Sequence, residues 1–348
     1  MAKALHSRVR KNISKGLHKG LSKLFPVNQN PEPIKLDEIK KILVVRINYR
    51  IGNILFTTPL LNALKKQFLD AQIDMMVGAP FTASLVEGLP QINKVYSFPR
   101  KLLKQPLEVL ALKKELKNND YDLLVTPNLN STSDTLFTFL VSATYKVGFY
   151  AKDVFSPLTH AVESTSEVKH EALKPLVLMS AFSDAPLESY TPYLDIRLSQ
   201  EEKVAARTDI APQSIGIFRD ARGEKKLDDA WWKSLLDALY ILAPELHIVD
   251  ILDPNNTTAL REDLQTLSEK NLRTLAAKIA NLDAFICGDT GPMHLASASK
   301  TPTIALFKTT SPEYYGTLGE KDLSLVLKDK SIETVAKEIL THLGIISA

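Results

Sequence analysis

The chain has 348 residues, of which 45% are hydrophobic and 24% charged, and its formal net charge is +3. This length suits two α/β domains in series, and the composition is that of a soluble globular protein. The small net charge gives no indication of nucleic acid as a partner. A single cysteine, Cys287, excludes an internal disulfide and is typical of a reducing compartment.

The first 30 residues contain Lys and Arg but no Asp or Glu. Apolar residues recur at every fourth position from Leu5 to Phe25, which predicts a helix with an apolar stripe flanked by cations. We interpret residues 3–25 as a contact with an anionic membrane surface, and residues 26–33 as a linker to the folded body. A disordered basic arm and a mitochondrial-type presequence are the alternatives. No segment reaches the roughly 20 apolar residues that span a bilayer, and the leader lacks the apolar core of a secretory signal.

Strands and helices alternate in a predicted N-terminal domain over residues 34–185. Ile42–Ile47 is a continuous apolar run, typical of a strand buried on both faces. A loop over Asn48–Asn53 follows, and Thr58 and Pro59 are expected to be the N-cap and first residue of a helix. We expect two further strands, at 73–77 and 121–126, and helices at 107–117 and 135–142. This alternation predicts a parallel sheet with helices on both faces.

A second alternating series predicts a C-terminal domain over residues 200–330, after a linker rich in Ser, Pro and Asp at 183–200. The expected strands are 215–218, 246–252, 284–287 and 303–307, the last of which completes the core. The expected helices are 231–242 and 272–280. A final helix, 331–343 within the segment 331–348, could pack on either domain. The predicted fold class is therefore α/β, with two Rossmann-like parallel sheets and a basic N-terminal extension.

Open parallel sheets bind ligands at the carboxyl ends of their strands. Three loops have that position: 48–53, 219–226 and 288–294. The second loop carries Arg219, Arg222, Lys225 and Lys226, which suits a pyrophosphate, although a solvated basic loop is an equally common pattern.

The third loop gives the most information. We expect Gly288 and Gly291 to allow a sharp turn and a close approach to a ligand, Thr290 to cap the next helix, and Pro292 to lie in its first turn. The exposed N–H groups of such a turn attract phosphate, and Asp289 could bind sugar hydroxyls. The alternative is an ordinary strand–turn–helix junction.

Three segments together resemble glycosyltransferase family 9, the ADP-heptose:lipopolysaccharide heptosyltransferase family. Arg46–Pro59 resembles the opening signature, in which an Arg is followed by Gly-Asp and then Thr-Pro. Ala143–Phe149 resembles an internal segment that ends in Val-Gly-Phe. Ala284–Tyr315 resembles the C-terminal signature, which contains Asp, Ser or Thr, and then Gly-Pro-Met-His-Leu-Ala. The resemblance covers roughly residues 40–345.

The resemblance implies the GT-B architecture, with the acceptor on the N-terminal side of a cleft and the nucleotide-sugar on the C-terminal side. It implies an inverting, metal-independent transfer, without a cofactor, from a nucleotide-sugar such as ADP-heptose to a lipopolysaccharide core or similar glycolipid, by an enzyme at the cytoplasmic face of the membrane. Lys225 would neutralise the donor phosphates, Asp289 would bind the sugar, and the Thr290 and Gly291 N–H groups would bind pyrophosphate. We also expect Arg219, Arg222, Met293 and His294 on the donor side, with a structural role as the alternative for His294. Arg46, Arg50 and Gly52 are expected on the acceptor side.

The main departure from the family pattern is Asn53, where the family has the Asp that acts as the base. An amide cannot accept the proton of the acceptor hydroxyl, although it can orient that hydroxyl. Another acid could serve, with Asp134 as our candidate, the leaving group could activate the acceptor sufficiently, or activity could be lost. A relative without activity would bind nucleotide-sugar or act as a scaffold in a membrane assembly. Asp253–Asn256 and Lys308 also depart from the pattern, on the donor side.

Overall fold

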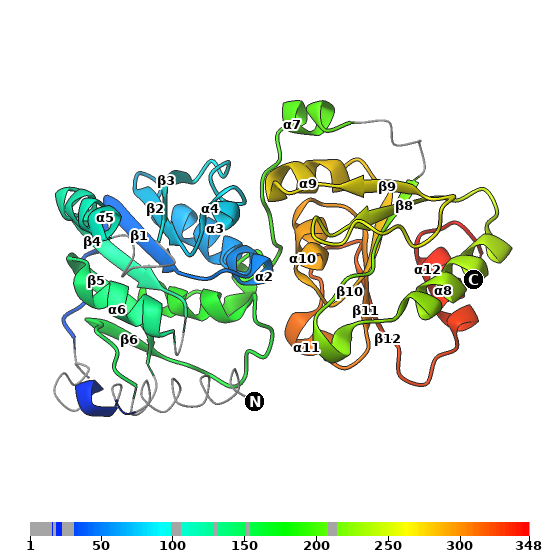
Figure 1. Ribbon diagram of the computed structural model, residues 1–348. Helices are drawn as coiled ribbons and strands as arrows, with labels where there is room; N and C mark the ends of the chain where they lie inside the picture. Colours follow the sequence, from blue (N-terminus) through cyan, green and yellow to red (C-terminus); the bar gives the residue numbers. More distant parts are fainter. Residues whose placement is uncertain are drawn as a thin grey trace.

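The computed structural model describes residues 16, 19–22, 31–98, 106–128, 131–150, 154–207 and 214–347. Most of the predicted membrane-binding leader, residues 3–25, lies outside these residues. Two six-stranded sheets form the body of the protein (Figure 1).

The first sheet has the strand order β3-β2-β1-β4-β5-β6, and every pair in it is parallel. Its strands are β1 (Lys41–Arg46), β2 (Gln72–Val77), β3 (Ile92–Ser97), β4 (Tyr121–Thr126), β5 (Ala143–Tyr150) and β6 (His160–Glu163). Its helices are η1 (Leu36–Glu38), α2 (Ile51–Leu55), α3 (Thr58–Gln67), α4 (Pro80–Ala83), α5 (Pro106–Asn118) and α6 (Thr132–Leu140). The segments η3 (Lys174–Ala181) and η4 (Leu187–Ser189) lead out of this lobe.

The second sheet is also entirely parallel, with the order β12-β11-β10-β7-β8-β9. Its strands are β7 (Ser214–Phe218), β8 (His247–Leu252), β9 (Gln265–Ser268), β10 (Ala284–Gly288), β11 (Thr303–Phe307) and β12 (Leu323–Val326). Its helices are α7 (Gln200–Ala205), η5 (Gly223–Lys225), α8 (Asp229–Leu242), α9 (Leu272–Ile279), α10 (Gly291–Ala298), α11 (Pro312–Tyr315) and α12 (Ile332–His342).

Numbered from its own first strand, each sheet has the order 3-2-1-4-5-6, which is that of the Rossmann fold. The order reverses between β1 and β4 in the first sheet, and between β7 and β10 in the second. Ligands of such sheets bind at this reversal point, beyond the carboxyl ends of the strands. The expected α/β fold with two Rossmann-like sheets is confirmed.

The two lobes share one apolar core where α2 packs against α10, and both helices lie between the sheets in Figure 1. The cluster joins Ile54 and Leu55 of α2 to Leu295 and Ala296 of α10, all of them fully buried. The final helix α12 packs on α8 of the second lobe through Val335, Ile339 and Leu340.

Several local predictions were wrong. The loop expected at 48–53 already contains the start of α2 at Ile51. The N-cap of α3 is Thr57, whereas Thr58 lies inside the helix, and its hydroxyl donates to the Leu55 carbonyl. The Thr303–Phe307 strand does not complete the sheet, because β12 pairs with its outer edge.

Candidate functional site

The turn between β10 and α10 lies at the reversal point of the second sheet. Pro292 is in the first turn of α10, as predicted. Thr290 occupies the N-cap position, but its side chain makes no capping hydrogen bond, so the expected side-chain cap is wrong. Its buried Oγ1 has no hydrogen-bond partner among the described residues. The first N–H groups of α10 are therefore not capped by this side chain, and a helix N-terminus of this kind favours an anion.

Neither glycine of this turn has the positive φ that favours glycine. Positive φ values among the described glycines occur at Gly223 and Gly344, so Gly288 and Gly291 do not need glycine for the turn itself. A Cβ on Gly291 would lie 3.1 Å from Cβ of Ile51. The absent side chain therefore brings α10 close to α2 of the other lobe.

Lys225 and Asp289 form an ion pair beside this turn, with 2.5 Å between Nζ and Oδ2. The Thr310 hydroxyl donates to the same oxygen at 2.7 Å, and the Lys225 ammonium lies 5.4 Å from the centre of the Tyr315 ring. Oδ1 of Asp289 has no hydrogen-bond partner within the described ranges. The pair thus places a half-exposed cation and a nearly buried carboxylate next to the N-terminus of α10.

The four cations of the loop after β7 have different surroundings. Gly223, with φ of +66°, begins η5, which carries Lys225. Arg222 is exposed, and Lys226 pairs with Asp220 at 3.1 Å.

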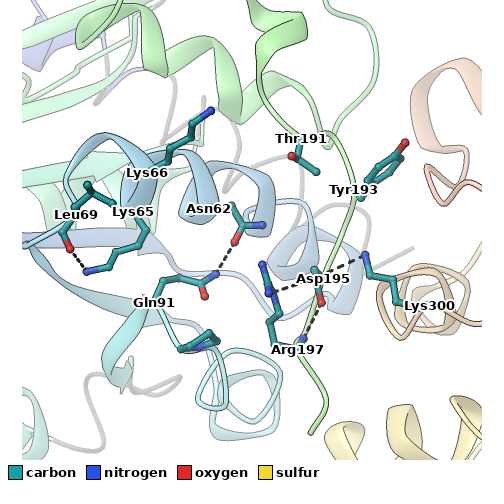
Figure 2. Close-up of a pocket in the computed structure, with 11 residues that line it drawn as sticks. Asn62, Lys65, Lys66, Leu69, Gln91, Thr191, Tyr193, Asp195, Arg197 and Lys300 are labelled. Atoms are coloured by element: carbon teal, nitrogen blue, oxygen red, sulfur yellow. Dashed lines mark hydrogen bonds and ion pairs between the residues drawn. The ribbon is translucent and has the colours of Figure 1, made fainter. Parts of the chain in front are cut away.

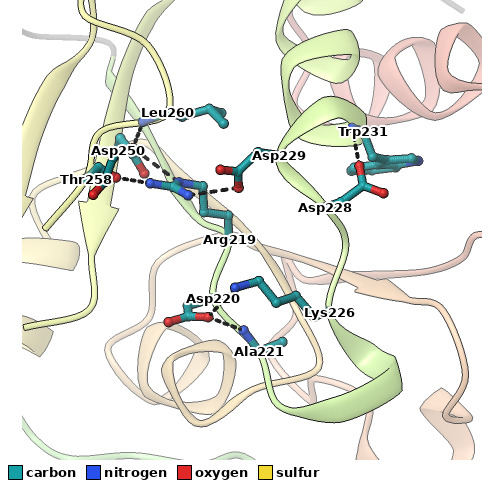
Figure 3. A network of polar contacts seen from close by, with 10 residues as sticks. All are labelled: Arg219, Asp220, Ala221, Lys226, Asp228, Asp229, Trp231, Asp250, Thr258 and Leu260. Atoms are coloured by element: carbon teal, nitrogen blue, oxygen red, sulfur yellow. Dashed lines mark hydrogen bonds and ion pairs between the residues drawn. The ribbon is translucent and has the colours of Figure 1, made fainter. Parts of the chain in front are cut away.

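Arg219 points away from this loop into a buried network (Figure 3). Its guanidinium donates to Asp229 at 2.9 Å, to Asp250 at 3.4 Å and to the carbonyl of Thr258. Burial raises the pKa of Asp250, while the N–H of Leu260 and the Arg219 guanidinium oppose this shift. Arg219 therefore joins three segments of the second lobe, and this arrangement does not support the predicted contact with the donor.

α10 packs against α2 through His294. The His294 ring stacks edge-on against Phe56 at 4.5 Å, and a Cβ on Gly52 would lie 2.8 Å from its Cδ2. Burial lowers the pKa of His294 to about 3, although Asp289 opposes the shift, so the imidazole is neutral. Met293 has no exposed surface, and its side chain belongs to the shared core.

Residues of the opening signature meet at the end of β1. Arg46 is 6% exposed, and its Nε donates to the Asn53 carbonyl at 3.1 Å. Burial lowers the pKa of Arg46, and the nearby carboxylates of Asp134 and Glu171 oppose this shift. The half-buried Asn53 side chain has no hydrogen-bond partner among the described residues. Arg50 is exposed at the start of α2.

Asp134 is 1% exposed, and both of its oxygens accept hydrogen bonds. Oδ1 accepts from the Ile47 N–H at 3.1 Å, and Oδ2 accepts from the Asn128 amide at 3.0 Å. Burial raises its pKa to about 6, while Asn128 and Arg46 oppose the shift. These contacts fix the loop that follows β1.

Residues 169–171 of the first lobe meet α11 of the second at a seam that was not predicted from the sequence. Lys169 pairs with Glu313 at 2.6 Å, His170 contacts the Gly316 carbonyl at 2.9 Å, and the Glu171 N–H donates to the Tyr314 carbonyl at 3.0 Å. Glu171 also pairs with Lys174, and its side chain is 34% exposed. Because these partners are more than 140 residues apart in the chain, no local pattern indicates the seam.

No helix within the described ranges is long and apolar enough to cross a membrane. The same ranges contain no group of three or more His, Cys, Asp or Glu side chains that could hold a metal ion.

The model of glycosyltransferase family 9 (heptosyltransferase) matches residues 109–342, which is more than half of the chain. The chain belongs to glycosyltransferase family 9. Lipopolysaccharide heptosyltransferase 3 of Escherichia coli is 28% identical over 284 residues, covering 74% of this chain and 81% of that protein. Lipopolysaccharide heptosyltransferase 1 of Pseudomonas aeruginosa is 25% identical, over 82% and 83% of the two chains.

Solved structures of family 9 proteins share the fold. A family 9 glycosyltransferase from Veillonella parvula has a TM-score of 0.76 at 18% identity, covering 91% of this chain and all of that chain. E. coli heptosyltransferase WaaC with ADP has a TM-score of 0.74 at 18% identity, over 87% and 99% of the chains. The two Rossmann-like sheets of this family 9 protein are therefore those of a GT-B glycosyltransferase.

Proposed function

We propose that this family 9 protein transfers a heptose, or a related sugar, from a nucleotide-sugar to a lipopolysaccharide core or similar glycolipid. The relatives named as lipopolysaccharide heptosyltransferases, and the structure of WaaC with ADP, support ADP-heptose as the donor. The observation that carries the proposal is the Lys225–Asp289 pair beside the N-terminus of α10.

The donor diphosphate would bind at the first turn of α10. The N–H groups of this turn, together with the Thr290 hydroxyl that lacks a partner, would bind phosphate oxygens. Lys225 would neutralise the diphosphate, and Oδ1 of Asp289 would accept a hydroxyl of the sugar. Arg222, which is exposed on the same loop, is the second cation available to the phosphates.

Transfer with inversion would proceed by one displacement. The acceptor hydroxyl oxygen forms a bond to the anomeric carbon while the bond from that carbon to the diphosphate oxygen breaks. Negative charge grows on the departing diphosphate, so Lys225 and the α10 N–H groups stabilise the transition state more than the ground state. The proton of the hydroxyl must pass to a base.

We assign that proton to the carboxylate of Glu171 in preference to Asp134. Both oxygens of Asp134 are already bonded inside the first lobe, and its side chain is 1% exposed. Glu171 is partly exposed at the interlobe seam and acts electrostatically on Arg46, which holds Asn53. Asn53 would orient the acceptor hydroxyl without taking its proton.

A glycolipid acceptor requires the enzyme to act at a membrane surface. We propose that the basic leader binds the cytoplasmic face of the inner membrane, since a helix with an apolar stripe and flanking cations suits anionic lipid. Arg50, exposed beside Asn53, would face the acceptor.

The test is to incubate the purified full chain with ADP-heptose and a truncated core glycolipid, and to measure ADP release and the mass of the glycolipid. The expected result is one added heptose for each ADP released. Neither product would appear if the proposal is wrong.

Asn53 favours one other function, a relative without activity that binds nucleotide-sugar or serves as a scaffold. Binding of ADP-heptose without turnover, restored to turnover by Asn53→Asp, would support that function. Turnover by the wild type would exclude it.

A further inference from the structure

A cavity of about 490 Å³ lies where the interlobe linker passes between the two lobes (Figure 2). α3 and the turn before β3 line it from the first lobe, linker residues 191–197 cross it, and Lys300 closes it from the second lobe. We propose that this hinge cavity binds a small polyanion that carries phosphate groups.

The hinge cavity is separate from the donor turn. Lys300 lies just after the last turn of α10, whereas Asp289 lies just before its first turn. The helix between them has eight residues, which separates its ends by roughly 12 Å. None of the residues that line the hinge cavity belongs to the turn at 288–294.

The lining has an excess of positive charge. Lys65, Lys66, Arg197 and Lys300 contribute four cations, and Asp195 contributes the single carboxylate. Asp195 is shared, since Oδ2 lies 3.2 Å from Nε of Arg197 and 3.6 Å from Nζ of Lys300. The two lysines of α3 have no ion pair to any described carboxylate. A ligand with two or more negative charges would balance this excess.

Two of these cationic residues have an unfavourable backbone conformation. Arg197 has φ of 47° and Lys300 has φ of 67°, and they are two of the four described non-glycine residues with positive φ. Glycine or asparagine would adopt this conformation more easily. Strained residues of this kind concentrate at binding sites. The strain at Arg197 and Lys300 therefore favours a ligand-binding role for their side chains.

The remaining polar groups suit phosphate esters. Asn62 accepts a hydrogen bond from Gln91 at 2.9 Å through Oδ1, which leaves its NH₂ group free to donate. Thr191 and Tyr193 also line the hinge cavity. Its volume lies within the roughly 300–1,000 Å³ typical of small-molecule sites. Since both lobes supply cations, a bound polyanion would also hold the lobes together.

Inorganic pyrophosphate tests the proposal by calorimetry on the full chain. The Lys225→Gln variant is used throughout, so that binding at the donor turn is weakened. We expect Lys225→Gln to retain a pyrophosphate site, and the added pair Lys66→Gln and Lys300→Gln to weaken it at least tenfold. The matched control pair Lys113→Gln and Lys114→Gln, exposed on α5, should leave the affinity unchanged.

An unchanged affinity in the Lys66/Lys300 variant, or no binding at all once Lys225 is replaced, would overturn the proposal. Thermal unfolding of each variant confirms that the variants fold. ADP, and vesicles that carry a phosphorylated glycolipid, then distinguish a free ligand from a lipid-linked one. The binding of each is measured with Lys66 and Lys300 intact and with both replaced by Gln. An inactive transferase that still binds pyrophosphate here would refute the proposed function and leave this site standing.

Discussion

Lys225 and Asp289 are 64 residues apart in the chain, yet their charged atoms lie 2.5 Å apart at the carboxyl ends of the adjacent strands β7 and β10. The strand order of the second sheet reverses between these two strands. The ion pair therefore marks the position where a Rossmann-like sheet binds its ligand. It also keeps the ammonium beside the first turn of α10 before any donor arrives, so that less reorganisation is needed on binding.

Replacing Lys225 by Gln should lower the rate of sugar transfer by about 100- to 1,000-fold, because the departing diphosphate loses its nearest cation. The free energy of unfolding should fall as well, because the Asp289 carboxylate, which is 6% exposed, loses its ion-pair partner. The rate is measured by ADP release. The control is Lys226→Gln, because Lys226 lies on the same loop and its exposed side chain pairs with Asp220. Equal losses in both variants would show that the general charge of the loop matters rather than Lys225.

Glu171→Gln should lower the transfer rate by about 100-fold or more, because a carboxamide cannot take the hydroxyl proton. The affinity for ADP should remain, since Glu171 belongs to the first lobe. Asp134→Asn is the matched variant, and we expect it to retain most activity. If Asp134→Asn abolishes transfer in a folded protein while Glu171→Gln does not, the proton acceptor is Asp134.

Asp134 should make the protein less stable as the pH rises. Its pKa is raised from 3.8 to about 6 by burial, so the folded state binds the proton more tightly than the unfolded state. The free energy of unfolding therefore decreases between about pH 4 and pH 6, by about 3 kcal/mol from this group, and is constant above that range. Urea unfolding at several pH values should show this decrease in the wild type relative to Asp134→Asn. A difference between the two proteins that is independent of pH would contradict the assignment.

Gly52→Ala should separate the lobes. The new Cβ would lie 2.8 Å from His294 Cδ2, and the ring cannot move freely because it packs on Phe56. We expect a loss of about 1–3 kcal/mol in unfolding free energy, together with reduced transfer. Gly288→Ala is the control, since the nearest atom to its Cβ is 3.9 Å away. Thermal unfolding of the two variants gives the comparison, and equal stability would show that α2 and α10 do not pack as described.

Continuous apolar strands could be predicted from the sequence, because burial on both faces requires uninterrupted apolar runs. β4 and β11 have the expected bounds, and β1, β2 and β10 differ by one residue at one or both ends. The four edge strands β3, β6, β9 and β12 were missed, and so was β5. Their residues are largely half-buried or exposed, so polar positions interrupt the apolar pattern.

The candidate site was predictable only where one segment supplies it. The turn from Asp289 to Pro292 could be identified because it follows a buried strand and begins a helix. The roles of Arg219 and Glu171 could not be predicted. The partners of Arg219 come from α8, β8 and the loop after β8, and those of Glu171 include α11 in the other lobe. Met293 belongs to the same motif as Asp289, yet the helical turn directs its side chain into the core.

Titration calorimetry of ADP with the wild type and with Lys225→Gln tests most directly whether the first turn of α10 holds the donor diphosphate. Tight binding by the wild type and a decrease in affinity of about tenfold or more in the variant are the predicted results. Equal affinities, or no binding of ADP by the wild type, would contradict the assignment of this turn.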